Sequence, residues 1–108
     1  MAQRVMVQDT AADADALAGT LLEFAPGPGV MRLWSASTVN TAQWSVDVGG
    51  GNIIRGQVIP LRTSGIPNIS DDPSTDVVVV GGEKNLVNLG GTTGTIHTIA
   101  EFVPLDEL

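Results

Sequence analysis

The chain has 108 residues, including 13 glycines and no cysteine, and carries a formal net charge of −7 at pH 7. This length corresponds to one domain, and the absence of cysteine excludes disulfides and thiolate chemistry. The five basic residues are spread singly, so they form no cluster that would bind a row of phosphates, and an acidic chain avoids anionic membrane surfaces. No apolar run approaches the roughly 18 residues of a membrane span. We therefore expect neither a nucleic acid nor a membrane as partner.

The first residues are predicted to form an N-terminal arm, residues 1–16, ahead of a β-sandwich domain that spans residues 17–108. Val5 and Val7 alternate weakly with their neighbours, which is typical of a strand or of an extended arm. An extended arm can add as a strand to an exposed sheet edge of another protein. We therefore expect that deletion of residues 1–8 leaves the sandwich folded and abolishes attachment to a partner.

A short helix is one interpretation of residues 11–18, because Asp9 or Thr10 can cap its start and Gly19 can end it. A helix of about two turns is only marginally stable by itself. A loop that lies against a neighbour is the other interpretation of this segment.

Apolar and polar side chains alternate most clearly in residues 42–48, which predicts a strand with one buried face. The glycines at 49–51 then allow the chain to reverse into a second strand over residues 53–59. The same rhythm of short apolar runs and turn residues predicts further strands at residues 20–24, 30–35, 76–80, 84–89 and 95–103. About seven or eight short strands predict an all-β fold, an antiparallel β-sandwich or jelly roll.

The valine-rich strand 76–80 is continuously apolar, so we expect it to be buried on both faces. Glycine-rich stretches follow it at residues 81–84 and precede the last strand at residues 90–95. Neither stretch has the Gly-Lys-Ser/Thr ending of a phosphate-binding loop, and each leads into a strand instead of a helix. We therefore interpret both as hairpin turns.

The longest irregular stretch is residues 61–75, which contains two prolines. Loops of this length are usually functional or mobile. Its apolar side chains Leu61, Ile66 and Ile69 indicate that it packs against something. Together with Val5 and Val7 of the arm, they are the candidate partner-binding residues.

Catalytic and metal-binding chemistry finds little support. The single histidine, His97, has no cysteine or second histidine to work with, so a structural role is favoured. Asp71, Asp72 and Asp76 are oxygen ligands of the kind that calcium prefers, but Pro73 interrupts them and their spacing is not that of an EF-hand. A solvated loop is the favoured interpretation, so we predict no catalytic, cofactor-binding or metal-binding residues.

The two tryptophans offer an alternative function, because exposed aromatic rings on a β-sandwich can stack on sugars. Trp44 shares its face with Val46 and Val48, which favours the core. The placement of Trp34 is left open by its sequence neighbours. A carbohydrate- or surface-binding module is therefore kept as the alternative function.

Two segments carry a resemblance to a known class of proteins. Residues 17–26 read Leu-Ala-Gly-Thr-Leu-Leu-Glu-Phe-Ala-Pro. This resembles the N-terminal signature of small decoration (cement) proteins from tailed bacteriophages, roughly L-A-G-x-x-F/L-E-F-x-P, although Leu22 takes a position that is often aromatic. Residues 80–89 resemble the hairpin A-G-D-x-L-x-V-x-L of the same proteins, with Glu83 where aspartate is common. The acidic turn at residues 71–73 falls where these proteins often have one.

The resemblance implies a non-enzymatic virion protein that binds the outer surface of an icosahedral capsid and stabilises contacts between capsomers. Its partner would be the major capsid protein, and it would self-associate as a dimer or trimer. Self-association also agrees with the positive mean hydropathy, which indicates more apolar surface than a monomer of this size carries. The first residues contain no apolar signal core, so we expect synthesis in the host cytoplasm and a final location on the capsid exterior.

Overall fold

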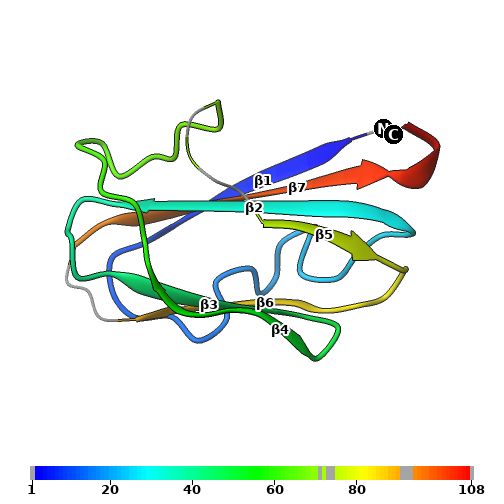
Figure 1. The fold of residues 1–108 in the computed structure, drawn as a ribbon, viewed down its shortest axis with the longest axis horizontal. Helices are drawn as coiled ribbons and strands as arrows, with labels where there is room; N and C mark the ends of the chain where they lie inside the picture. The colour runs from blue at the N-terminus through cyan, green and yellow to red at the C-terminus, as the bar shows by residue number, and fades with distance from the viewer. Residues whose placement is uncertain (1, 71, 73–74, 91–93, 108) are drawn as a thin grey trace.

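The computed structural model describes residues 2–70, 72, 75–90 and 94–107, and its strands form two stacked antiparallel sheets (Figure 1). The described strands are β1 (Gln3–Asp9), β2 (Gly29–Ser37), β3 (Gln43–Val48), β4 (Gly51–Val58), β5 (Thr75–Val79), β6 (Asn85–Gly90) and β7 (Ile96–Pro104), followed by the 3-10 helix η1 (Leu105–Glu107). The larger sheet has the order β1-β7-β2-β5, and the smaller sheet has the order β4-β3-β6. The predicted all-β sandwich is therefore confirmed.

The strand order also identifies the type of sandwich. Residues 13–25 run antiparallel along the free edge of β6, with isolated bridges from Asp13 to Leu89 and from Phe24 to Lys84. If this segment is counted as the second strand, the two sheets take the strand order of an eight-stranded jelly roll. An irregular segment thus holds the place of a regular strand.

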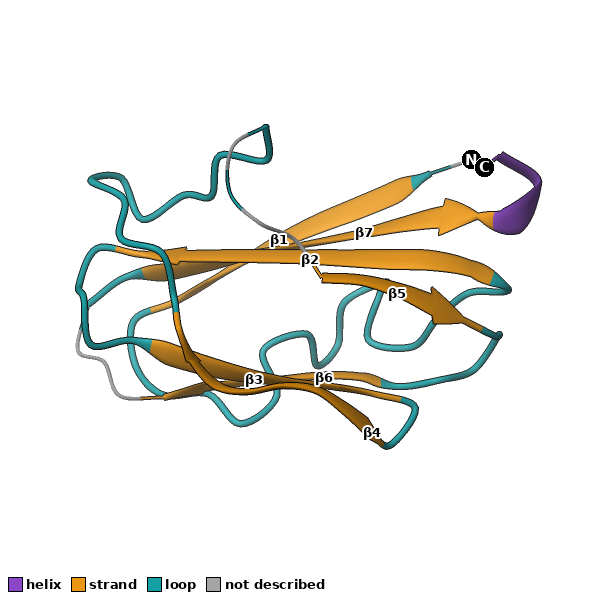
Figure 2. Ribbon diagram, in the orientation of Figure 1, coloured by secondary structure: helices purple, strands orange, loops and turns teal. Residues whose placement is uncertain are grey.

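The core lies between the two sheets, as Figure 2 shows by the position of the two strand layers. Trp44 and Val46 of β3 face it, and both are almost fully buried, as the alternation in residues 42–48 predicts. Met31 and Leu33 of β2 face them from the larger sheet. The outward positions of the same strands carry most of the polar side chains.

The N-terminal arm is not free, because β1 pairs with β7 along its whole length, from Gln3 opposite Phe102 to Asp9 opposite Ile96. Val5 and Val7 pack against the core from this strand. Deletion of residues 1–8 would remove most of an edge strand and uncover part of the core. We therefore replace the expectation of an intact truncated sandwich with one of strong destabilisation.

The segment after β1 contains neither the short helix nor the strand expected at residues 20–24. Residues 11–18 form bends and turns, and the backbone of Asp13 exchanges two hydrogen bonds with Leu89 at 3.0 and 2.7 Å. A helix this short loses more in nucleation than its few internal hydrogen bonds recover. Bonds to the edge of β6 satisfy the same backbone groups in an extended arrangement.

Two further expectations are wrong because they depend on which strands become neighbours. β5 is an edge strand, and Val78 is 80 % exposed, so the valine run is buried on one face only. The turn at Gly81 and Gly82 joins β5 to β6, which belong to different sheets, so it is a connection between layers and not a hairpin. The same holds for the connection from β6 to β7, of which residues 91–93 lie outside the described residues.

Candidate interaction surface

One long side of the sandwich is closed by residues 13–25, which we call the belt. Ala16 N donates to Val87 O at 2.9 Å, and Asn85 N donates to Glu23 O at 2.8 Å, so the start and the middle of β6 are bonded to the belt, in addition to the bonds between Asp13 and Leu89 near its end. Leu17 and Leu22 of the belt are fully buried in the core. Together, the belt and the edge of β6 form what we call the closed seam.

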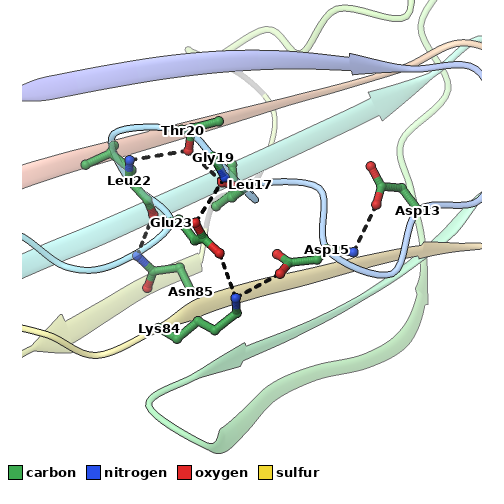
Figure 3. A network of polar contacts seen from close by, with 9 residues as sticks. All are labelled: Asp13, Asp15, Leu17, Gly19, Thr20, Leu22, Glu23, Lys84 and Asn85. Carbon is green, nitrogen blue, oxygen red and sulfur yellow. Dashed lines mark hydrogen bonds and ion pairs between the residues drawn. The ribbon is translucent and has the colours of Figure 1, made fainter.

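Charged side chains fasten the belt to β6. Lys84 Nζ lies 2.8 Å from carboxylate oxygens of both Asp15 and Glu23 (Figure 3). Hydrogen bonds to Asp15 and then to Glu23 raise the pKa of Lys84, and the hydrogen bonds that Glu23 accepts from Lys84 and from Gly19 N lower the pKa of its carboxyl. The sequence segment that carried the family resemblance is thus built into this seam.

The opposite long side is open. A groove of about 320 Å³ runs between the sheets where the edge strands β4 and β5 approach each other. Its lining is largely apolar and consists of Trp44, Ile53, Ile54, Gln57, Val58, Pro60, Thr75 and Asp76. Within the described part of the chain, Thr75 Oγ1 is buried without a hydrogen-bond partner. We call this groove, together with the outer edge of β4, the open seam.

The open seam also carries an uncompensated charge. Arg55, on β4, is exposed and forms no ion pair in the part of the chain that the structure describes, whereas each of the other four basic residues does. β4 is bulged against β3 on both sides of Val46, and Gly56 has a φ of +61° within the bulged stretch. The edge of β4 is therefore irregular, exposed and cationic at one point.

The loop after β4 crosses the outer face of the larger sheet (Figure 2). Arg62 N donates to Ser37 O at 2.8 Å, and His97 Nδ1 lies 2.8 Å from Gly65 O. Because a carbonyl oxygen only accepts, His97 donates through Nδ1 and holds the loop. Gly65 has a φ of +71°, and a Cβ at this position would lie 3.0 Å from Thr38 Cγ2, so glycine suits this close approach.

A partly buried ion pair gives the loop its internal shape. The guanidinium of Arg62 binds the buried carboxylate of Asp72, which also accepts a hydrogen bond from Asn68 N at 2.8 Å. The hydrogen bonds from Arg62 lower the pKa of Asp72. Leu61, Ile66 and Ile69 nevertheless remain 56 %, 42 % and 38 % exposed.

The outer face of the larger sheet carries an apolar row beside a charged row. Val30 lies opposite both Val78 and Val103, which places these three residues, the valine row, side by side across β5, β2 and β7. The next row outward on β2 contains Arg32, which pairs with Asp76 and Glu101 at 3.6 Å each. The neighbouring charges are therefore balanced within the chain, and the valine row is left as apolar surface, with Val78 80 % exposed and Val30 and Val103 partly exposed.

The predicted partner-binding residues separate into two groups. Leu61, Ile66 and Ile69 are exposed on the loop, where a partner can reach them. Val5 and Val7 are half-buried against this chain's own core, and the side chain that β1 exposes between them is that of Met6, at 55 %. Whether any of the five binds a partner stays a prediction.

The residues weighed for chemistry have structural surroundings. His97 contacts a backbone carbonyl, Asp72 pairs with Arg62, and Asp76 pairs with Arg32, while Asp71 lies outside the described residues. In the described part of the chain, no three acidic or histidine side chains gather as a metal ion requires. Nor does that part contain a helix of the length and hydropathy needed to cross a membrane.

Both tryptophans are buried, Trp34 at 6 % and Trp44 at 5 % exposure. Trp44 lies in the core between the sheets, as predicted. Trp34 alternates with the core residue Leu33 and so faces outward from the larger sheet, where Ile99 lies opposite it and is also buried. The loop that crosses this face explains how outward side chains are shielded from water.

Comparisons with known proteins add no relative: no family model, no curated protein and no solved structure matches this chain. The arguments on function therefore depend on the fold and on the surfaces described above.

Sequence reasoning missed most of the exposed apolar positions. Ile53 and Val58 on β4, Val78 on β5, and Leu21 and Phe24 on the belt are all at least 42 % exposed. Each lies in an apolar stretch that was assigned to a strand interior. The edge positions of β4 and β5 follow from strand order, which alternation along one strand does not reveal.

Proposed function

We propose that this chain is a non-enzymatic structural protein of a virion that binds the outer surface of a phage capsid and stabilises contacts between capsomers. Its principal partner is the major capsid protein, and copies of the chain associate as dimers or trimers. The protein is made in the host cytoplasm and resides on the capsid exterior. The observation that carries the proposal is the valine row, an apolar surface in which Val78 is 80 % exposed and Val30 and Val103 are partly exposed, and whose neighbouring charges are already balanced.

The fold supports this class of function by analogy. Jelly rolls occur in viral capsid proteins and in lectins, and fold alone does not decide between them. Lectin-like binding by stacking needs exposed aromatic rings, but both tryptophans are buried, and Lys84 Nζ lies over the half-exposed ring of Phe24. Exposed aliphatic side chains such as Val78 and Ile66 suit a protein partner better than a sugar.

Because the protein attaches at many lattice sites, the affinity of each single contact can be low. A capsid presents the same site repeatedly, and linked copies of a weak binder gain strongly in avidity. Binding to the folded state alone also stabilises a small domain. Modest apolar patches, such as the valine row and the loop residues Ile66 and Ile69, are therefore sufficient for a stable coat.

The test is co-sedimentation of the purified chain with heads assembled from the major capsid protein of the same genome. We expect saturable binding with a copy number that matches a set of symmetry-related lattice sites. Val78→Lys should lower occupancy, because it places a charge in the valine row, whereas the matched control Asn88→Lys, on the exposed side of β6, should not. Absence of co-sedimentation at micromolar concentrations would refute the proposal.

A further inference from the structure

We propose that the open seam is a docking site for an extended segment of a partner protein, with apolar side chains for the groove and a carboxylate for Arg55. The inference goes beyond the proposed function, because it holds for any partner that offers such a segment. In the proposed complex, this chain supplies the exposed sheet edge, and the partner's segment adds to it as a strand through backbone hydrogen bonds.

The closed seam shows what kind of segment fits between these two sheets. There the belt supplies three things to the edge of β6: backbone hydrogen bonds, the buried side chains of Leu17 and Leu22, and two carboxylates that bind Lys84 (Figure 3). The belt achieves this without being a regular strand. The fold therefore accepts an irregular segment, which contains turns, along a sheet edge.

The open seam presents three corresponding features, and none of the described segments covers it. Among the described strands, none neighbours the outer edge of β4. The groove beside it is lined mostly by apolar side chains, including Ile53 and Val58, which are 42 % and 56 % exposed, and Asp76 in its lining pairs with Arg32. Arg55 on the same strand is the counterpart of Lys84, but none of the described carboxylates pairs with it.

Charge favours an acidic partner segment over a second copy of β4. Two antiparallel β4 edges related by a twofold axis would bring Arg55 of each copy towards the other, and like charges across paired strands are destabilising. A charged residue and a bulge are also the devices by which edge strands avoid indiscriminate pairing. A segment that carries aspartate or glutamate removes the repulsion and supplies the missing ion pair.

The experiment is a selection from a displayed library of random peptides of about eight residues, the length of β4, on the purified 108-residue chain. We expect enrichment of peptides that alternate apolar residues and contain an acidic residue. Synthetic peptides from the selection, measured by fluorescence anisotropy, should bind Arg55→Glu about tenfold more weakly, because an exposed ion pair is converted into a repulsion. Hydrogen exchange should show new protection of amides in β4 and none in β1.

Matched variants keep the test decisive. Val58→Lys should also weaken peptide binding, whereas Leu21→Lys, an exposed apolar position of the closed seam, should leave it unchanged. Both substituted positions of β4 are exposed, so thermal unfolding should match the wild type, and Ile53→Lys replaces either variant that fails to fold. The proposal is overturned if no peptides are enriched, or if the peptides bind Arg55→Glu and Val58→Lys as tightly as the wild type. It is also overturned if the chain forms a concentration-dependent dimer that Arg55→Glu abolishes.

Discussion

The closed and open seams are the two long sides of one sandwich, and they differ in what covers the sheet edge. At the closed seam, belt residues bond to β6 and bury two leucines. At the open seam, β4 and β5 leave an apolar groove and an exposed Arg55. Where the belt covers a sheet edge, its contacts stabilise the fold. Where the sheet edge of β4 is left uncovered, we propose that it binds a partner.

The comparison also bears on residues 17–26, one of the segments on which the expectation of a phage decoration protein is based. Residues 17–26 supply Leu17, Leu22 and Ala25 to the core, and Glu23 binds Lys84. Their pattern is accounted for by packing and by the closure of a sheet edge. The surfaces proposed to bind partners lie elsewhere, on β4, on the valine row across β5, β2 and β7, and on the loop after β4.

The largest expected effect separates two adjacent leucines of the belt. Leu22→Ala empties a fully buried site and should lower the free energy of unfolding by about 2–5 kcal/mol. Leu21→Ala is the matched control, because Leu21 is 76 % exposed, and it should change stability by less than about 0.5 kcal/mol. Urea unfolding measures both. Equal effects would show that the belt is not packed as described.

The cations of the two seams provide the next test. Lys84→Met removes two ion pairs and the contact of Nζ with the Phe24 ring, at 5.3 Å from its centroid, while it keeps the aliphatic stem. It should lower the urea midpoint of unfolding. Arg55→Met removes a charge without an ion pair and should leave the midpoint unchanged. A larger decrease in the urea midpoint for Arg55→Met than for Lys84→Met would contradict the stabilising role that we assign to the closed seam.

The smallest expected effect is a pH dependence at the entrance to the belt. Burial, followed by a hydrogen bond with Asp13, raises the pKa of Asp9 from 3.8 to about 6. In this window the folded protein keeps a proton that the unfolded chain releases, so this group makes the free energy of unfolding fall as the pH rises from about 4 to 6. The pKa values of Asp72 and Glu23 are lowered instead, so these two carboxyls make the free energy of unfolding fall as the pH drops below their ordinary pKa values.

Asp9→Asn should therefore flatten the pH profile of stability above about pH 4 and stabilise the protein at neutral pH, as thermal unfolding in a pH series would show. Asp106→Asn, at an exposed position of η1, is the control and should retain the wild-type slope. An unchanged slope in Asp9→Asn would indicate that Asp9 is not the group responsible.

Much of the fold is predictable because alternation is a local property. The pattern of residues 42–48 identified β3 and its buried face, and the longer apolar runs identified β2, β5, β6 and β7. Of the candidate site, the loop residues Leu61, Ile66 and Ile69 are exposed where a partner can reach them, while Val5 and Val7 face the core.

The sequence by itself determined that this protein is built from short strands, since side-chain alternation and turn residues act within a few positions of the chain. Only the tertiary structure decided which edges stay free. The turn at Gly81 and Gly82 connects the two sheets instead of forming a hairpin, and Val78 faces outward. Residues 13–25 cover the edge of β6 without forming a regular strand. Each of these outcomes depends on contacts between segments far apart in the chain, and local pattern carries no information about such neighbours.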